Sequence, residues 1–280
     1  MGANAEQAEF WSGDPGRKWV AHQPLLDHLF SEATAALFEA AEIGPGARVL
    51  DIGCGAGDTT LEAARRAGAT GRALGIDVSA PLLALAEERA RDVPNAAFLK
   101  ADAQSHGFGA GGFDRLTSRF GVMFFDDFDA AFGNLRRALA PGGRAALLAW
   151  APQGENPWSQ IPRDAGVARL GPPSPTPPGA PGQFAFADPV PVAERLRGAG
   201  FAEVEAGFLD IHLRIDGGAR EAAVLATMVG PISRIMAEHD GTEEDRAAIV
   251  ADVAERFRAF ETADGVRVPA RLTRFTARVP

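Results

Sequence analysis

Residues 49–60 read VLDIGCGAGDTT, and this stretch decides how the rest of the chain is interpreted. The apolar run predicts a buried first strand, and the three alternating glycines predict a tight turn before a helix. Glycine at such a turn tolerates a positive φ and carries no Cβ, so a ligand can lie directly on the backbone. A dinucleotide-binding fold needs G-x-G-x-x-G, but the sixth position holds Asp58 when counted from Gly53 and Thr60 when counted from Gly55. The glycine spacing therefore disfavours a nicotinamide oxidoreductase.

Residues 48–150 alternate between strand and helix patterns. Helices are expected over 59–67 and about 127–139, the second closed by the Pro-Gly-Gly of 141–143. The further strands that we expect cover 72–77, 96–100, 113–118 and 145–150. Repeated strand–helix units favour an α/β fold with a doubly wound, mostly parallel sheet.

The segments around this core predict a lid, an insertion and a cap. In residues 1–47, Trp11 and Trp19 join apolar residues at helical spacing, so we expect an N-terminal helical lid, or tryptophans that simply anchor a surface helix. The remaining segments are a Pro/Gly-rich insertion at 151–188, a core helix and strand at 189–218, a helical cap insertion at 219–263 and a closing strand at 264–280. An antiparallel last strand would complete a seven-stranded sheet.

Composition narrows the class of protein. The formal net charge is −9, and no basic cluster offers a face to nucleic acid. The single cysteine, Cys54, excludes an internal disulfide and a multi-cysteine metal site. No apolar run approaches the roughly 18 residues of a membrane span, and no secretory signal is visible at the start of the sequence, so a cytoplasmic protein is expected. Lys18 and Lys100 are the only lysines, a usage typical of a bacterial GC-rich genome.

Three acids are expected at the carboxyl ends of neighbouring strands. Asp51 ends the first strand, Asp77 the second, and Asp102 follows the third. Open α/β sheets bind ligands at this edge, so the three acids together indicate a binding site more specifically than any one of them. By contrast, the contiguous acids at 126–129 predict the start of a helix rather than a metal cage, and we expect no bound metal.

Five motifs resemble those of the class I S-adenosylmethionine (SAM) dependent methyltransferases, and most closely the ubiquinone/menaquinone-biosynthesis-like branch. They are LDIGCGAG at 50–57, GIDVS at 75–79, ADAQ at 101–104, SRFGVMFF at 118–125 and LRRALAPGG at 135–143. The resemblance is strong over 48–150 and looser elsewhere. It implies a seven-stranded methyltransferase fold with a helical cap, SAM as cofactor and S-adenosylhomocysteine as product.

The resemblance also implies a set of binding residues. The glycine loop and Asp77 would hold SAM, with Asp77 accepting from the ribose hydroxyls, because a carboxylate can accept two hydrogen bonds. Asp102 and the N–H of Ala103 would meet the adenine, and Asp51 would lie near the amino group. Residues 118–120 would border the methionine end and the substrate. The cofactor contacts that we expect are Asp51, Gly53, Cys54, Gly55, Gly57, Asp77, Val78, Asp102, Ala103, Ser118 and Trp11.

The expected reaction is an in-line methyl transfer to a small molecule, for which orientation and a dry site are the main requirements. Aromatic and apolar side chains favour an apolar or aromatic acceptor, with Phe120, Met123 and Trp158 as candidate contacts. A general base is needed only if the acceptor must lose a proton, and His22 and His106 are the candidates. A SAM-binding sensor or scaffold without turnover stays open as an alternative. The sequence leaves the acceptor and the oligomeric state unknown.

Overall fold

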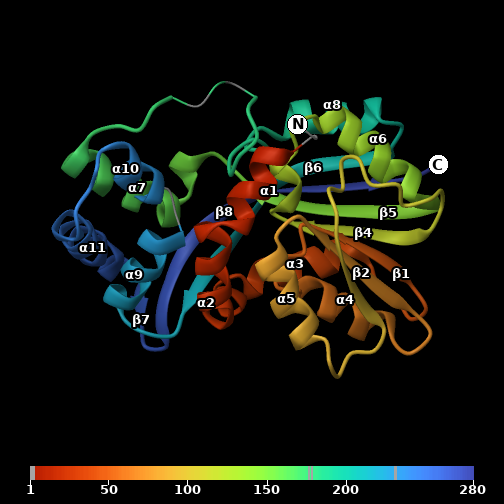
Figure 1. The fold of residues 1–280 in the computed structure, drawn as a ribbon, viewed down its shortest axis with the longest axis horizontal. Helices are drawn as coiled ribbons and strands as arrows, with labels where there is room; N and C mark the ends of the chain where they lie inside the picture. The colour runs from red at the N-terminus through yellow and green to blue at the C-terminus, as the bar shows by residue number, and fades with distance from the viewer. Residues whose placement is uncertain (1–3, 176, 178, 230–231) are drawn as a thin grey trace.

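The computed structural model describes residues 4–175, 177, 179–229 and 232–280. At its centre lies one sheet with the strand order β3-β2-β1-β4-β5-β8-β6 (Figure 1). The strands are β1 (Arg48–Ile52), β2 (Arg72–Asp77), β3 (Ala96–Lys100), β4 (Phe113–Arg119), β5 (Leu139–Trp150), β6 (Ala202–Ile215), β7 (Glu261–Thr262) and β8 (Gly265–Arg278). The first five strands pair in parallel, and β8 runs antiparallel between β5 and β6. The expected mostly parallel sheet with an antiparallel last strand is confirmed, and the two-residue β7 adds an eighth strand beside β8.

Two layers of helices cover the sheet. One face carries α3 (Ser31–Ala41), α4 (Asp58–Ala67) and α5 (Ala80–Arg89), and the other carries α6 (Phe128–Ala138) and α8 (Pro189–Gly198) (Figure 1). The start of α6 is fixed by Asp127, whose carboxylate accepts from the N–H groups of Asp129 and Ala130. This confirms the helix start that the acids at 126–129 predicted, because a side-chain oxygen at the N-cap satisfies free helix N–H groups.

Strand β5 begins earlier than its apolar run suggests. The expected strand covered 145–150, whereas the observed one starts at Leu139, which pairs with Phe113 of β4. The register between β4 and β5 shifts after Phe113, and the glycines at 142 and 143 lie within this irregular stretch. An irregular pairing of this kind accommodates extra residues, which a pattern of apolar side chains cannot reveal.

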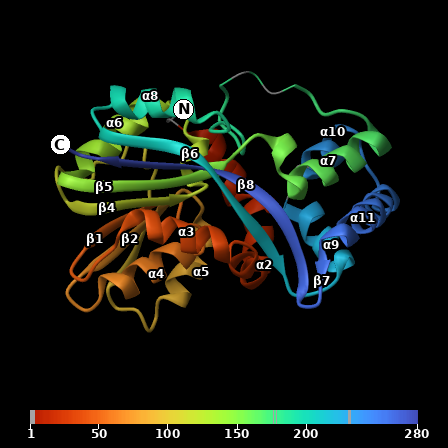
Figure 2. The same ribbon diagram turned by 180° about the vertical axis from the view of Figure 1, so that it is seen from behind.

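A cap of four helices lies beside the core. These helices are α7 (Pro157–Leu170), α9 (Ala219–Val229), α10 (Ile232–Glu238) and α11 (Glu243–Phe257), followed by the short η3 (Arg258–Phe260). Strands β6 and β8 are long and curve out of the core toward the cap (Figure 2). Helix α7 occupies the first half of the expected Pro/Gly-rich insertion and packs against α11, so the irregular character predicted for that segment does not extend to 157–170. No helix among the described residues is both long and apolar enough to cross a membrane.

The N-terminal segment forms α1 (Ala5–Ser12) and α2 (Asp14–Leu29), which run between the core and the cap (Figure 1). A break at Phe30 separates α2 from α3. Helix α2 packs against α5 and also contacts β6 and α9. The N-terminal helices therefore lie at the junction of core and cap.

Candidate functional site

The three glycines of the turn after β1 have three different surroundings. Their φ angles are all positive, at 66° for Gly53, 54° for Gly55 and 86° for Gly57. A Cβ on Gly53 would lie 2.5 Å from the Cα of Gly121, and a Cβ on Gly57 would lie 2.8 Å from the ring of Phe98. A Cβ on Gly55 would meet no described atom within 4 Å. Gly53 and Gly57 thus permit close packing, while a Cβ on Gly55 would have open space around it.

The Asp51 carboxylate is fully buried and is bound by the protein's own hydroxyls. Its Oδ2 accepts from Thr59 Oγ1 at 2.6 Å and from Thr60 Oγ1 at 2.7 Å, and its Oδ1 accepts from Thr117 Oγ1 at 2.8 Å. Burial raises the pKa of Asp51, and the three hydroxyls act against that shift. We expected this carboxylate beside the amino group of the cofactor. Its contacts instead tie β1 to α4 and β4, which disfavours a direct ligand contact.

The Asp77 carboxylate lies against the glycine turn, as expected for the acid at the end of β2. Its Oδ2 accepts from the N–H of Gly55 at 2.8 Å, and its Oδ1 accepts from the N–H of Ser79 at 2.8 Å. Burial raises the pKa of Asp77, while hydrogen bonds from the N–H groups of Ser79, Gly55 and Val78 lower it. A carboxylate offers about four acceptor positions, so Asp77 can hold the bare part of the turn and still accept from a ligand hydroxyl.

Asp102, after β3, lies next along the same edge of the sheet. Its Oδ1 accepts from Asn4 Nδ2 at 2.7 Å and from the N–H of Gln104 at 2.9 Å. The carbonyl of buried Ala103 accepts from Asn134 Nδ2 at 2.9 Å, whereas no described residue accepts from the Ala103 N–H. The Ala103 N–H is therefore still available to donate the hydrogen bond that the expected adenine contact requires. The contact with Asn4 was not predicted and joins the N-terminus to this acid.

The N-terminal helices are fastened over this edge by polar contacts. Ser79 Oγ donates to the carbonyl of Trp11 at 2.7 Å, directly beside Asp77. Asn4 donates its N–H to Asp126 Oδ2 at 2.6 Å and accepts at Oδ1 from the Asp126 N–H at 2.6 Å. The expected lid helices thus contact the ends of β2 and β3 and the segment after β4.

A row of aromatic rings runs from the lid helices into the core. We call Trp11, Trp19, Phe30, Phe120 and Trp150 the aromatic row, and its successive ring centroids lie 5.8, 6.2, 5.3 and 4.9 Å apart. The row begins on α1 and ends on β5. It gives the junction of lid and core an aromatic wall, which suits flat apolar groups because rings prefer edge-to-face or offset stacking.

The three expected acceptor contacts have different positions. Phe120 belongs to the aromatic row, with its ring stacked on Trp150. Met123 is buried, and its carbonyl accepts from the N–H of Gly182 at 3.0 Å. Trp158 is buried inside the cap, where its ring stacks on Phe257 at 5.8 Å. Phe120 therefore lies where the lid meets the core and Trp158 lies in the cap, and each ring is buried against another ring.

The remaining candidates are spread around the site. His22 lies partly exposed on α2, whereas the ring of His106 packs edge-on against Phe108 at 4.9 Å. Ser118 is fully buried, and its Oγ donates to the carbonyl of Ile52 at 2.8 Å. Cys54 is also buried, and burial together with the nearby acids raises the pKa of its thiol well above the ordinary value. A thiol in that state is a poor nucleophile, because the thiolate is the reactive form.

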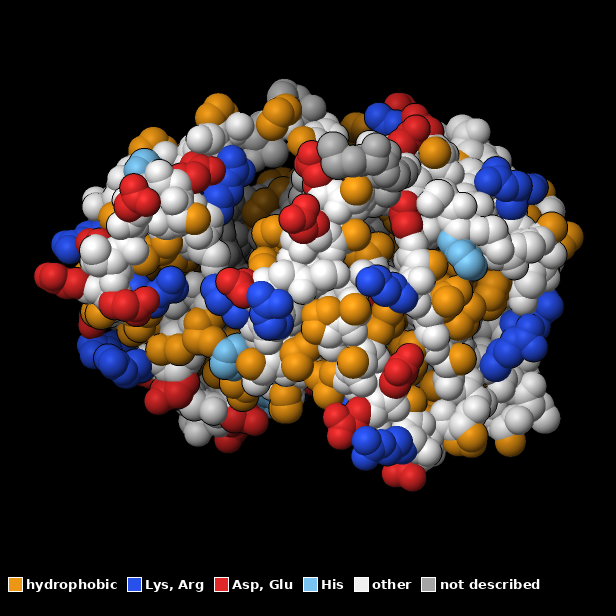
Figure 3. Space-filling model, viewed as in Figure 1, with side chains coloured by type: hydrophobic (Ala, Val, Ile, Leu, Met, Phe, Trp, Pro, Cys, Tyr) orange, Lys and Arg blue, Asp and Glu red, His pale blue; other side chains and the backbone are white. Residues whose placement is uncertain are grey.

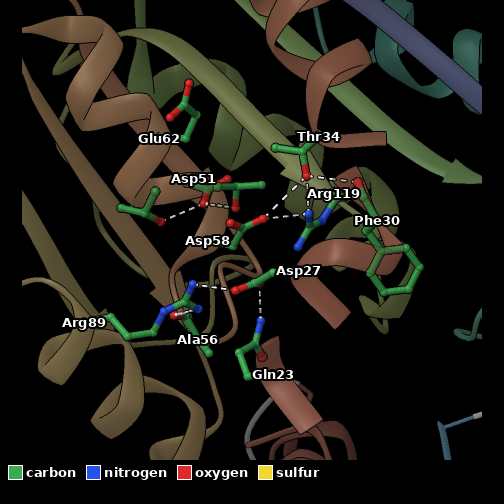
Figure 4. A network of polar contacts seen from close by, with 12 residues as sticks. Gln23, Asp27, Phe30, Thr34, Asp51, Ala56, Asp58, Glu62, Arg89 and Arg119 are labelled. Carbon is green, nitrogen blue, oxygen red and sulfur yellow. Dashed lines mark hydrogen bonds and ion pairs between the residues drawn. The ribbon is translucent and has the colours of Figure 1, made fainter. Parts of the chain in front are cut away.

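A network of charged side chains beside the glycine turn was missed by the sequence reasoning (Figure 4). Arg119 Nη1 lies 2.8 Å from Asp58 Oδ2 and also donates to Thr34 Oγ1. Arg89 donates Nη2 to Asp27 Oδ2 at 2.6 Å and Nη1 to the Ala56 carbonyl at 2.8 Å. These residues come from six different elements or turns, so no spacing in the sequence could have grouped them.

Comparison with known proteins identifies the family. A family model described as a methyltransferase domain matches residues 49–143. The nocamycin O-methyltransferase of Saccharothrix syringae is 31% identical over 196 residues, which cover 66% of this chain and 70% of that protein. The chain belongs to the class I SAM-dependent methyltransferases. This confirms the expected family and its cofactor, SAM.

A quinone methyltransferase is also similar to this methyltransferase. The 2-phytyl-1,4-naphtoquinone methyltransferase of Thermosynechococcus vestitus is 39% identical over 133 residues, covering 45% of this chain and 59% of the relative. The match therefore spans less than two thirds of that relative's length. Among solved structures, the [4+2]-cyclase SpnF aligns over 95% of both chains, with a TM-score of 0.56 and 21% identity. At that identity the likeness shows a shared fold and no more.

The residues of the site fit SAM on three observations. The turn has bare backbone at Gly55, Asp77 lies beside it with acceptor capacity, and the Ala103 N–H has no acceptor among the described residues. These groups follow three neighbouring strands and match a nucleoside along the edge of the sheet.

Proposed function

We propose that this methyltransferase transfers the methyl group of SAM to a small aromatic or apolar acceptor and releases S-adenosylhomocysteine. The observation that carries the proposal is the bare Gly55 backbone held against the Asp77 carboxylate, in a chain of this family. Such a turn accepts a ligand against the main chain, and the carboxylate supplies acceptors for a diol.

Each part of the cofactor has a proposed place. Asp77 would accept from the ribose hydroxyls, with Val78 beside it, and Asp102 and the Ala103 N–H would meet the adenine. The glycine turn, with Gly53, Cys54, Gly55 and Gly57, would pass beneath the methionine end. Asp51 and Ser118 would act indirectly, because the structure buries both side chains and pairs them with other parts of the protein.

The aromatic row supports the choice of acceptor. Figure 3 shows a hollow between the cap and the N-terminal helices, with apolar side chains inside it. The named relatives act, by their names, on a naphthoquinone and on nocamycin. A phenol or quinol could stack on Phe120 while its reacting atom faces the cofactor.

The chain's own contribution to the reaction would be orientation and exclusion of water. When bound, SAM supplies a methyl group that is already activated by its sulfonium. The lid contacts of Asn4 and Trp11 would close the site, and the aromatic row would fix the ring plane of the acceptor. His22 lies on the lid helix, whereas the ring of His106 packs against Phe108, so we propose His22 as the first base to test.

The proposal is tested by turnover. The protein is incubated with SAM and a panel of naphthoquinols, phenols, primary amines and thiols, and S-adenosylhomocysteine is measured by mass spectrometry. We expect product only with the aromatic hydroxyl or quinol compounds. Binding of SAM without product from any compound would favour the sensor alternative, and product from amines alone would contradict the aromatic acceptor.

We also propose a bacterial cytoplasmic setting, supported by the single cysteine and the scarcity of lysine. The six segments expected from the sequence stay as proposed units. The structure supports their roles as lid, core and cap, with α7 joining the cap helices.

A further inference from the structure

Helix α2 crosses the carboxyl end of β1. Near its start, a Cβ on Gly16 would lie 3.1 Å from Ser79 Oγ, just after β2. Just after its end, the ring of Phe30 lies 5.3 Å from Phe120 and 6.2 Å from Trp150, which follow β4 and end β5. Because β1 lies between β2 and β4 in the sheet, the middle of α2 passes over the glycine turn.

Gln23, in the middle of α2, has a buried oxygen without a partner. The residue is 5% exposed, and its Nε2 donates to Asp27 Oδ1 at 2.6 Å. Its Oε1 receives no hydrogen bond from any described residue. The amide cannot be turned round without placing its oxygen against the Asp27 carboxylate, so the unpartnered atom is the acceptor. Buried acceptors of this kind are rare in native proteins and call for an explanation.

The acids near Gln23 are already paired within the protein. Asp27 is joined through Arg89 to the carbonyl of Ala56, inside the glycine turn (Figure 4). Burial raises the pKa of Asp27, and the negative charge of Asp58 raises it further, while the positive charge of Arg89 acts against that shift. Arg89 and Arg119 each pair with one of these acids. Both arginines therefore bond to carboxylates, and neither donates a hydrogen bond to the Gln23 oxygen.

The position of Asp58 and Arg119 relative to Asp77 indicates which part of the cofactor would reach Gln23. Asp77 ends β2, on one side of the turn, whereas Asp58 is paired with Arg119, which ends β4 on the other side. If the ribose lies on Asp77, the amino-acid end extends toward Asp58 and Arg119. The donor that this end carries is an ammonium group.

We propose that Gln23 Oε1 accepts a hydrogen bond from the ammonium group at the methionine end of SAM. This inference rests on the proposed function and names a contact from the lid helix. It also gives α2 a way to respond to a loaded site, because the same side chain bonds to Asp27, which is coupled to the glycine turn.

The test is calorimetric titration of Gln23→Leu with two ligands that share a nucleoside. S-adenosylhomocysteine carries the ammonium group, and 5′-methylthioadenosine lacks the amino-acid end. We expect the Kd for S-adenosylhomocysteine to rise about tenfold, since one hydrogen bond from a charged donor is lost, and the Kd for methylthioadenosine to change less than about twofold.

Gln160→Leu is the matched control. On α7 in the cap, Gln160 Nε2 donates to Asp164 Oδ1 at 2.7 Å, the same four-residue spacing as Gln23 and Asp27. This variant is expected to bind both ligands as the parent does. If Gln23→Leu fails to fold, Asp27→Asn paired with Asp164→Asn provides the same comparison, with an expected loss of about threefold for S-adenosylhomocysteine alone.

The outcomes separate this inference from the proposed function. Equal losses for both ligands would overturn the ammonium assignment in favour of a ribose contact. Unchanged affinity of Gln23→Leu for both ligands would overturn the inference while the parent's binding upheld the cofactor site. Failure of the parent protein itself to bind S-adenosylhomocysteine would overturn the proposed function.

Discussion

Asp77→Ala is expected to weaken S-adenosylhomocysteine binding about 100-fold. The carboxylate would lose two hydrogen bonds from ribose hydroxyls, and bonds to a charged acceptor contribute about 1.5–3 kcal/mol each, so a loss near 3 kcal/mol is expected. The variant also loses the acceptor for the Gly55 and Ser79 N–H groups, which hold the turn in shape. Asp77→Asn should lose less, because an amide keeps one oxygen. Calorimetric titration of both variants measures the effect.

Asp114→Ala is the control for this comparison. Asp114 is a half-buried acid near the start of β4, paired with Arg48 at 2.7 Å, and lies at the opposite end of the strands from Asp77. The Asp114→Ala variant should bind S-adenosylhomocysteine with the affinity of the parent protein. If Asp77→Ala binds as tightly as the parent protein, the ribose role of Asp77 is refuted, whatever the effect on stability.

Gly53→Ala is expected to destabilise the fold by roughly 3 kcal/mol. An added Cβ would lie 2.5 Å from the Cα of Gly121. The next nearest atoms are also backbone atoms of Gly121, which cannot rotate away. Overpacking costs about 1–3 kcal/mol, and a left-handed φ costs an alanine about 1–2 kcal/mol more. Urea unfolding followed by circular dichroism would measure the difference in the free energy of unfolding.

Gly55→Ala separates packing from binding in the same turn. Its φ of 54° gives a similar conformational cost, about 1 kcal/mol, but its Cβ would meet no described atom within 4 Å. This variant should fold stably and bind S-adenosylhomocysteine more weakly, because the Cβ would occupy the ligand's space. Equal destabilisation by the two substitutions would contradict the different roles that the structure gives Gly53 and Gly55.

The core of the fold was predictable because its signals are local. The apolar run before Gly53 and the acids near the ends of β1, β2 and β3 each mark the end of a strand. The Pro-Gly-Gly of 141–143 follows the end of α6 but lies within β5, so it marks the helix end alone. Their order then implied the parallel sheet. The extension of β5 to Leu139 was not predictable, because it depends on a shifted register with Phe113 of the neighbouring strand.

The site was predictable only in outline. Asp77 lies beside the glycine turn as expected, since the ends of neighbouring parallel strands meet at one edge. Asp51 has the expected position but a different set of partners, because Thr59, Thr60 and Thr117 converge on it from separate elements. Gln23 and Asn4 gave no signal, since their roles depend on where the lid helices lie across the sheet.

We propose that the carboxyl edge of β1, β2 and β3 binds SAM on the bare turn at Gly55. A crystal structure with S-adenosylhomocysteine tests this most directly. We expect ribose hydroxyls at hydrogen-bonding distance, about 3 Å, from the Asp77 carboxylate, with the adenine near the Ala103 N–H. Clear density for the ligand away from that edge, with Gly55 and Asp77 untouched, would contradict it.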